Sequence, residues 1–422
     1  MASIDIARSA TRAGLRIADY FLIVGFVVTT IVLARWPGLN DVPKLFGVLL
    51  LFSFMVHIIS SKRRIHVPAT FLIWMLWFFV AVVSLLLAEE VRFGKAIQLV
   101  QFAAVGFVLT NMLIWNRSTG FYVASLIGAL ALSGVLHVAG PSGPGFEALL
   151  TRAVERSNSH AVGLSVGMGL ALVAFIGVKT WSQRIALGGL IALFFVLLLT
   201  QGSRQAFLNG ILVAGGITAA VALYRAWLAD KGSLAVSVMA IGTAFPVAVA
   251  AAMSTDYWHR FQRVPDALQD PGVDGSIGGR LWMIERGLEL WATSPIIGIG
   301  PDNYRFSLSA DHFYSDVIGG YSHNHYIEIL VGTGLVGLFL YLSIYALWLG
   351  RLYVLRSALN SGRHFVGFTM VLVVVAIYVI NGMFNVHYYD RLFWLVLPFV
   401  VAELHLLSAE RSRRASRMRR RL

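Results

Sequence analysis

The stretch VPATFLIWMLWFFVAVVSLLLA, residues 67–88, decides which kind of fold the chain can adopt. It contains no Asp, Glu, Lys or Arg, and nearly every residue in it is apolar. An α-helix rises about 1.5 Å per residue, so a run of about 20 apolar residues crosses the hydrocarbon core of a bilayer. The stretch therefore predicts a transmembrane helix.

The composition of the whole chain agrees with a membrane environment. Hydrophobic residues make up 58% of the 422 residues and charged residues only 13%, whereas about 25% of the residues in a soluble domain are charged. A soluble protein of this size could not bury so much apolar surface, which excludes a soluble α/β enzyme and intrinsic disorder. Cys is absent, which excludes a disulfide framework, a thiol nucleophile and thiolate metal sites.

Apolar runs of sufficient length recur along the chain. The predicted fold class is an all-α polytopic integral membrane protein with about 12 transmembrane helices and one large extracytoplasmic loop that carries short amphipathic helices. The predicted spans are residues 20–36, 43–61, 67–88, 96–115, 120–139, 160–178, 185–201, 206–224, 233–252, 326–349, 365–383 and 392–408.

These spans divide the chain into four segments. Residues 1–252 form an N-terminal transmembrane region with helices 1–9, and residues 253–324 form the large loop. Residues 325–408 form a C-terminal transmembrane region with helices 10–12, and residues 409–422 form a basic cytoplasmic tail.

The distribution of Lys and Arg predicts the orientation of the helices. An even number of spans places both termini on one side, and the segments on that side contain 21 of the 34 Lys and Arg residues. Cytoplasmic segments carry such an excess in membrane proteins, so both termini are expected to be cytoplasmic. We interpret the basic tail as a topology anchor that contacts anionic lipid, in preference to a site for nucleic acid.

Polar residues concentrate in the large loop of residues 253–324, which is far longer than an ordinary connection. Its end, GGYSHNHYIE (residues 319–328), contains two candidate general bases, His323 and His325, because the pKa of imidazole lies near neutral pH. A metal site that uses both is an alternative without an obvious third ligand. A helix that starts here would direct free backbone N–H groups at a phosphate. Interfacial polar residues at a helix start are the simpler interpretation.

Three extracytoplasmic arginines are candidates for binding a diphosphate. Arg204 lies in TQGSRQAF, the turn between the seventh and eighth spans, and Arg280 lies in the large loop. Arg156, just before the sixth span, is a further candidate. A guanidinium stays protonated and grips phosphate oxygens through paired hydrogen bonds. Arginines bound to lipid headgroups are the alternative interpretation.

The residues after Arg280 predict a short amphipathic helix on the membrane surface. Its apolar face would consist of Leu281, Ile284, Leu288 and Trp291. Arg286 is expected on the solvated side of this helix, together with Glu285 and Glu289.

Three motifs in this part of the chain resemble those of bacterial O-antigen ligases. The HN of residues 323–324, followed by nine residues and the GLVG of residues 334–337, resembles the signature His-[Asn/Ser/Gln]-x9-Gly-x-x-Gly. The SRQA of residues 203–206 looks like the Ser-Arg-Gly/Gln-Ala element of the same superfamily. The GR of residues 279–280, together with residues 294–304, is similar to its large-loop motif. The superfamily also includes O-antigen polymerases and protein-glycosylating ligases.

The resemblance implies a glycosyltransferase on the periplasmic face of a Gram-negative inner membrane, with the large loop in the periplasm. Its partners would be an O-antigen polysaccharide donor on undecaprenyl diphosphate, a lipid A–core acceptor and membrane lipids, and no nucleic acid. His323 would be the catalytic residue that deprotonates or orients the acceptor hydroxyl. Asn324, His325, Gly334 and Gly337 would support it.

The resemblance also assigns the arginines. Arg204 and Arg280 would hold the diphosphate and neutralise its charge as it leaves, with Arg156 as a further candidate. That electrostatic role can replace a divalent metal, so no metal and no other cofactor is expected. Direct displacement by the acceptor would invert the anomeric centre.

Two other functions remain open at this point. An O-antigen polymerase would use a lipid-linked acceptor, and its arginines are often spread over two sizeable outer loops, whereas this chain has one dominant loop. A non-enzymatic transporter of lipid-linked glycans would need charged residues in the middle of the bilayer. The predicted spans contain few titratable side chains, namely His57, His137, Glu403 and His405.

Overall fold

The computed structural model describes residues 2–33, 39, 41–61, 63–88, 91, 93–139, 157–200, 208–229, 262–270, 275–307, 321–356 and 362–420. Every regular element in these residues is a helix, and they contain no strand. The elements are α1 (Ala2–Ile31), α2 (Val42–Ser61), α3 (Ala69–Leu86), α4 (Phe93–Asn116), α5 (Thr119–Ala139), α7 (Ser157–Gly177), α8 (Trp181–Thr200), η2 (Asn209–Gly215), α10 (Gly216–Ala229), α13 (Val264–Gln269), α14 (Gly275–Thr293), η3 (Tyr304–Phe306), α15 (His325–Leu355), α16 (Gly362–Asn381) and α17 (Arg391–Arg419).

In the described part of the chain, nine helices are long and apolar enough to cross a membrane. They coincide with nine of the predicted spans, which confirms an all-helical, multi-pass membrane protein. The predicted first span corresponds to a shorter apolar helix, Ile17–Ile31, and the eighth overlaps η2 and α10. The ninth, residues 233–252, lies outside the described residues, so the total of 12 stays a prediction.

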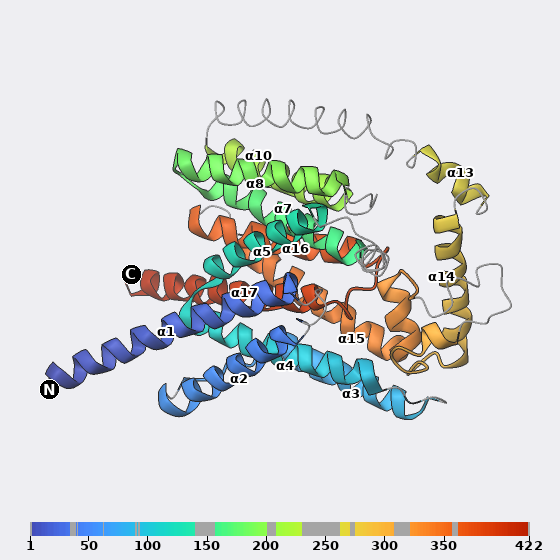
Figure 1. The fold of residues 1–422 in the computed structure, drawn as a ribbon, viewed down its shortest axis with the longest axis horizontal. Helices are drawn as coiled ribbons and strands as arrows, with labels where there is room; N and C mark the ends of the chain where they lie inside the picture. The colour runs from blue at the N-terminus through green and yellow to red at the C-terminus, as the bar shows by residue number, and fades with distance from the viewer. Residues whose placement is uncertain are drawn as a thin grey trace.

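Most of these helices run alongside one another in a single bundle, and α14 lies crosswise at one end of it (Figure 1). Both ends of the chain lie at the opposite end of the bundle (Figure 1). Helices far apart in the sequence are neighbours: α3 packs against α15, α4 against α17, and α7 against both α8 and α16. The described part of the large loop joins the bundle at α15, because α14 and η3 both pack against that helix.

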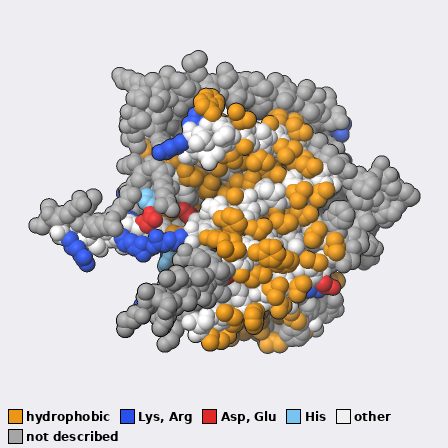
Figure 2. All heavy atoms as spheres, turned by 60° about the vertical axis from the view of Figure 1, so that its left-hand side comes forward, with side chains coloured by type: hydrophobic (Ala, Val, Ile, Leu, Met, Phe, Trp, Pro, Cys, Tyr) orange, Lys and Arg blue, Asp and Glu red, His pale blue; other side chains and the backbone are white. Residues whose placement is uncertain are grey.

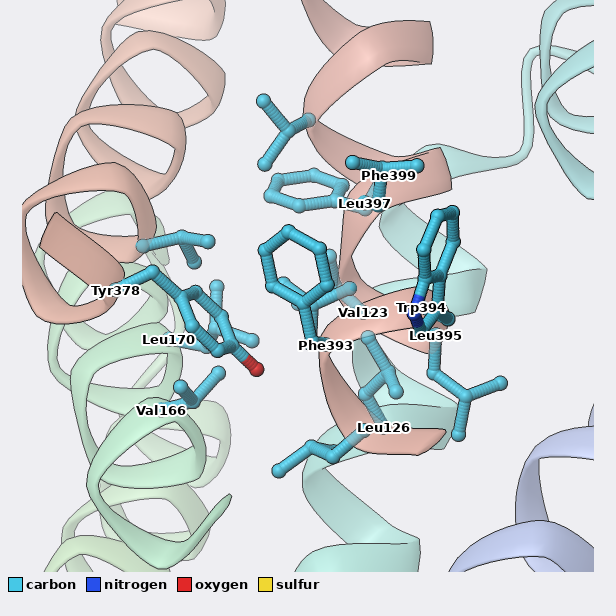
Figure 3. Packing of buried hydrophobic residues seen from close by; sticks show 14 of the residues in the cluster. Val123, Leu126, Val166, Leu170, Tyr378, Phe393, Trp394, Leu395, Leu397 and Phe399 are labelled. Carbon is cyan, nitrogen blue, oxygen red and sulfur yellow. The ribbon is translucent and has the colours of Figure 1, made fainter. Parts of the chain in front are cut away.

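Large aromatic side chains fill the middle of the bundle (Figure 3). The Phe393 ring of α17 lies 5.1 Å from the Tyr378 ring of α16, and Trp394 lies 4.9 Å from Trp74 of α3, measured between centroids. Lipid tails are as apolar as the helix side chains, so the hydrophobic effect does not drive helices together inside a bilayer. Close packing of side chains does so instead. Such aromatic pairs, each worth about 0.5–1.5 kcal/mol beyond their area, hold α3, α16 and α17 together.

The outside of the bundle is apolar. Figure 2 shows a face on which hydrophobic side chains spread broadly, while charged side chains gather toward its margins. Large exposed hydrophobic residues include Leu45, Val48, Phe52, Met55 and Ile59 of α2 and Leu72, Met75, Leu76, Phe79 and Leu86 of α3. Soluble monomers rarely expose apolar patches beyond a few hundred Å², so these faces fit contact with lipid.

A buried carboxylate connects three of the helices. Asp19 of α1 accepts hydrogen bonds from the Ser53 hydroxyl of α2 (2.8 Å) and from the Asn116 amide of α4 (3.0 Å), and its Oδ2 pairs with Nε2 of His57 at 2.8 Å. His57 is thus a packing residue with a polar partner. The sequence interpretation did not single out Asp19, which lies one residue before the first predicted span.

Candidate active site

The residues before α15 form a tightly hydrogen-bonded turn. Asn324 caps the helix, since its Oδ1 accepts hydrogen bonds from two backbone N–H groups of the first turn, at 3.0 and 3.1 Å. The N–H of His325 donates to the Gly382 carbonyl (2.7 Å), and that of Glu328 donates to the Asn324 carbonyl (3.0 Å). All four N–H groups of the first turn therefore have partners. The expectation of free N–H groups for a phosphate is wrong.

His323 occupies a strained position in this turn. Its φ is 50°, a left-handed conformation that is unfavourable for a residue with a Cβ. Burial and the positive charge of Arg280 lower the pKa of His323 to about 4, against the opposing effect of a hydrogen bond with the Asn385 side chain. The imidazole is therefore neutral at pH 7, as a group that accepts a proton must be.

Glu328 supports the turn from inside the protein. The side chain is 1% exposed, and its Oε2 accepts a hydrogen bond at 3.0 Å from the backbone N–H of Ser322, the residue before His323. The Ser322 hydroxyl donates in turn to the Asn324 carbonyl (2.7 Å). A carboxylate inside a membrane protein is costly and marks a functional site by default. Glu328 lies within the predicted span 326–349, but the sequence analysis did not count it among the titratable side chains of the spans.

Gly334 interrupts α15. Its φ of 64° and ψ of −168° are not helical, and a Cβ at this position would collide with the backbone of Ile296. After the kink, the N–H of Leu335 donates to the Pro295 carbonyl (2.9 Å), and the N–H of Val336 donates to the Ile296 carbonyl (3.2 Å). Only glycine fits such a left-handed position against another backbone.

The same loop also satisfies the carbonyls before the kink. The N–H of Ile299 donates to the Val331 carbonyl (2.9 Å), and the N–H of Gly300 donates to the Gly332 carbonyl (3.0 Å). The loop of residues 294–300 therefore replaces the helical hydrogen bonds that the kink removes. The motif of residues 334–337 and the motif of residues 294–304 are thus joined by backbone hydrogen bonds.

The second signature glycine permits close packing inside α15. A Cβ at Gly337 would collide with the Thr333 side chain on the preceding turn, and the Thr333 hydroxyl itself donates to the Ile329 carbonyl (2.8 Å). Gly334 and Gly337 accordingly shape the helix behind His323.

Helix α14 lies against α15, which fixes Arg280 near the turn. A Cβ at Gly287 would meet the Ile327 side chain at 2.5 Å, and the Tyr304 hydroxyl donates to the Met283 carbonyl at 2.6 Å. The predicted helix is confirmed, but it packs through Met283 and Gly287. Of the predicted apolar face, Leu281 and Leu288 stay more than a third exposed.

The charged face of α14 is arranged as the sequence predicted. Arg286 forms an ion pair with Glu289, and both side chains are partly exposed to solvent. Arg286 therefore belongs to the solvated side of α14 and is not brought to His323.

A second buried carboxylate lies beside Glu328. Asp302 is 5% exposed, adopts a φ of 70°, and accepts a hydrogen bond from Arg305 at 2.9 Å. It also hydrogen-bonds the Tyr321 side chain, two residues before His323. The negative charge of Asp302 and the positive charge of Arg305 both act on the Glu328 carboxyl group, and their effects oppose each other. Sequence reasoning missed this pair, because nothing in the order of residues shows that Asp302 folds back to the turn.

Two further cations flank an aromatic pair at the same place. The rings of Tyr321 and Tyr389 lie 5.3 Å apart, with Arg305 at 5.3 Å from the Tyr321 centroid and Lys95 at 5.3 Å from the Tyr389 centroid. Neither Lys95 nor Arg305 was a sequence candidate. Of the cations, Arg280 acts on His323 itself, while Arg305 is paired with Asp302.

His325 faces a different environment from His323. It is fully buried, stacks on the His387 ring at 3.8 Å between centroids, and its Nδ1 accepts a hydrogen bond from the backbone N–H of His387 at 3.3 Å. Nε2 of His387 lies 3.3 and 3.2 Å from the hydroxyls of Tyr341 and Tyr345. Burial lowers the pKa of His387 to about 3. His325 is thus part of the packed interior beneath the turn.

Of the predicted site residues, the structure brings together His323, Asn324 and Arg280. Arg204 and Arg156 lie outside the described residues, so their roles stay predictions. Within the described part of the chain, no group of three or more His, Cys, Asp or Glu side chains is arranged to hold a metal ion.

A family model matches part of the chain. The model of the O-antigen ligase family matches residues 189–342, the part of the chain that contains α14, the loop of residues 294–300 and His323. No curated protein matches the chain at a significant level.

Proposed function

We propose that the chain is an O-antigen ligase, because the model of the O-antigen ligase family matches residues 189–342. It transfers O-antigen polysaccharide from undecaprenyl diphosphate to a sugar hydroxyl of lipid A–core. The observation that supports this most is the proximity of His323 and Arg280, which come from separate motifs. Attack by a hydroxyl needs a base, and a departing diphosphate needs a cation. The pair supplies both.

In the proposed reaction, the acceptor oxygen attacks the anomeric carbon of the donor sugar. Its proton passes to the ring nitrogen of His323 that does not face Asn385. The bond between the anomeric carbon and the phosphate oxygen breaks, and its electron pair leaves with undecaprenyl diphosphate. Displacement from the opposite face inverts the anomeric centre. General-base assistance of this kind contributes about 10²–10⁴-fold in rate.

Donor binding would make His323 a stronger base. The pKa of about 4 describes the protein without its donor, where Arg280 adds an uncompensated positive charge to the effect of burial. A diphosphate held by Arg280 brings negative charge beside the imidazole, and an opposite charge at this range raises the pKa of His323. The base therefore gains strength when the substrate is in place.

The diphosphate is assigned to Arg204 and Arg280, with Arg156 as a further candidate. Arg305, which is paired with Asp302, and Lys95 flank the Tyr321–Tyr389 pair next to the turn of His323. Charge neutralisation by guanidinium groups makes a metal unnecessary. Purified protein with lipid-linked donor should keep its transfer activity in excess EDTA. Loss of activity on chelation, restored by Mg²⁺ or Mn²⁺, would overturn the metal-free mechanism.

The remaining signature residues act through structure. Asn324 caps α15 and holds the turn, and His325 packs beneath it. Gly334 and Gly337 allow the kink and the close packing that position the loop of residues 294–300. We propose that these residues support catalysis without touching the reacting atoms.

We place the site in the periplasm and both termini in the cytoplasm of the inner membrane. The excess of Lys and Arg in the segments of the terminal side supports this orientation. A reporter fused after residue 290 should be periplasmic, and one at residue 357 or after residue 415 should be cytoplasmic. A cytoplasmic reporter at residue 290 would move every proposed site residue to the wrong face.

An O-antigen polymerase is the alternative within the superfamily, and a non-enzymatic transporter of lipid-linked glycans is the alternative outside it. The lipopolysaccharide pattern of a deletion strain separates them. Loss of all long-chain bands, with lipid-linked polymer still accumulating, is expected for a ligase. A pattern of core plus one repeat would indicate a polymerase. Failure of lipid-linked donor to reach the periplasm would indicate a transporter.

A further inference from the structure

A cavity of about 610 Å³ lies at the far end of α16 and α17 from His323. His364 and Gly367, near the start of α16, line it, whereas the carbonyl of Gly382, just beyond the end of α16, receives the N–H of His325. The 20 residues of α16 span roughly 30 Å, about the thickness of the hydrocarbon core. The cavity is therefore separate from the candidate active site and lies at the end of the bundle that holds both chain termini (Figure 1).

The lining of the cavity is layered. Its outer level carries Arg117, Ser118 and Thr119 at the turn before α5, and the ion pair between His364 and Glu410 at 2.8 Å. Glu403 lies further in, against Gly367. The deeper level is apolar and includes Ile127, Leu190, Met370 and Phe399. A polar level above an apolar one matches an amphiphile, and the volume lies within the usual range of about 300–1,000 Å³ for ligand sites.

Two helices that line the cavity, α5 and α8, expose apolar side chains on their outer faces. On α5, Leu132 and Val135 are exposed, and on α8, Ile185 and Val196 are exposed, although all four are large hydrophobic residues. Apolar outer faces of this kind suit contact with lipid.

Arg117 directly follows the end of α4 and belongs to the polar level of the cavity. It is a non-glycine residue with a φ of 51°, and its side chain is exposed at the turn. A left-handed residue at this position is a common way for a helix to end. The turn itself is held by hydrogen bonds of Ser118, whose N–H donates to the Leu113 carbonyl (3.3 Å) and whose carbonyl accepts from the Tyr122 N–H (2.9 Å).

We propose that this cavity binds one phospholipid with a primary-amine headgroup, taken from the leaflet on the side of the chain termini. The phosphate would lie against the Arg117 guanidinium and the hydroxyls of Ser118 and Thr119. The ammonium group would lie toward the carboxylates of Glu403 and Glu410, and one acyl chain would follow the apolar level. The lining holds the carboxylates of Glu403 and Glu410, the latter paired with His364, as well as the Arg117 guanidinium. A lining with both charges favours a headgroup that also carries both over a purely anionic one.

A single substitution can fill the cavity. Gly128 lines it, and a Cβ at this position meets nothing within 4 Å, so Phe can extend into the space. Gly189→Phe is the matched control, because a Cβ at Gly189 also meets nothing within 4 Å and Gly189 does not line the cavity. Equal thermal unfolding of Gly128→Phe and Gly189→Phe in detergent shows that the first still folds. Arg117→Gln, at an exposed side chain, provides a second variant.

The test is native mass spectrometry of the purified full chain with added phosphatidylethanolamine, phosphatidylglycerol or phosphatidylcholine. Phosphatidylethanolamine should bind the wild type about tenfold more tightly than phosphatidylglycerol, as one charge-assisted hydrogen bond provides. Gly128→Phe should lose this binding while Gly189→Phe keeps it. Glu403→Gln should reduce the preference for the amine, and Arg117→Gln should weaken both phospholipids.

Three results would overturn the proposal. The first is equal retention of phosphatidylethanolamine by Gly128→Phe and Gly189→Phe. The second is equal binding of phosphatidylethanolamine and phosphatidylglycerol, or of phosphatidylcholine, whose ammonium has no N–H to donate. The third is recovery of a water-soluble anion in place of a lipid. None of these measurements uses glycosyl transfer, so they stand apart from the proposed enzyme activity.

Discussion

The carboxylate of Glu328 accepts a hydrogen bond from the backbone N–H of Ser322 at 3.0 Å, which joins the buried first turn of α15 to the residue before His323. The turn is strained, since His323 has a φ of 50°. Strained backbone relaxes when the contacts that hold it are lost. Glu328 is therefore proposed as a positioning residue for the base.

Replacement of Glu328 should show whether this residue positions His323 or takes part in the reaction itself. Glu328→Gln keeps an oxygen acceptor of similar size, whereas Glu328→Ala removes the acceptor for the Ser322 N–H. We expect Glu328→Ala to lower kcat about 10²-fold, the effect of a displacement of about 1 Å, with little change in donor affinity. Glu328→Gln should recover much of the rate. Glu289→Ala, on the exposed side of α14, is the control, and a wild-type kcat for Glu328→Ala would exclude a positioning role.

Gly334 should tolerate no side chain. Its φ of 64° and ψ of −168° form a conformation open essentially to glycine alone, which costs another residue about 1–3 kcal/mol. The added Cβ would also collide with the backbone of Ile296. Gly334→Ala should therefore lower the melting temperature in detergent and abolish transfer. Gly350→Ala, in the same helix, is the control, because its Cβ meets nothing within 4 Å. Equal melting temperatures for the two variants would mean that α15 is not held in the kinked form.

The sequence predicted the membrane helices well because length and apolarity alone decide whether a helix can cross a bilayer. Residues 67–88 became α3 within two residues at each end. The start of the tenth predicted span, residue 326, lies within one residue of the start of α15, although the capping role of Asn324 was not predicted. The kink at Gly334 was not visible. It depends on hydrogen bonds with residues 294–300, which no local pattern encodes.

The candidate site was predicted only in part. His323 and Arg280 could be chosen because their motifs resemble a family, but Asn385 and Asp302 are brought to the turn by tertiary folding alone. Glu328 offered a signal that was overlooked, namely a carboxylate inside an otherwise apolar run. The expectation that backbone N–H groups of α15 would bind a phosphate failed because Asn324 and Gly382 already accept them.

The pH dependence should report the environment of His323. The pKa of His323 is lowered to about 4, so the base stays unprotonated, and active, well below pH 6.5. As the pH is lowered along the acid limb of the profile, kcat/KM should therefore begin to decrease near pH 4. Below that pH the protonated ring cannot accept a proton, and activity is lost.

Arg280→Gln tests the cause of this shift. It removes the positive charge that helps to lower the pKa of His323, so the acid limb should move toward higher pH. Burial remains, and the limb should stay below pH 6.5. An acid limb near pH 6.5 in the wild type, or one that Arg280→Gln moves to lower pH, would contradict the arrangement.

The central claim is that His323 takes the proton while Arg280 holds the diphosphate. The most direct measurement compares donor affinity and single-turnover transfer for His323→Ala, Arg280→Lys and His325→Ala at matched expression. His323→Ala should lose about 10²–10⁴-fold in transfer rate and keep its donor affinity. Arg280→Lys keeps the charge but loses the planar pair of donors, so both affinity and rate should fall. His325→Ala should be milder. Normal transfer by His323→Ala, or full donor affinity and rate in Arg280→Lys, would contradict the account.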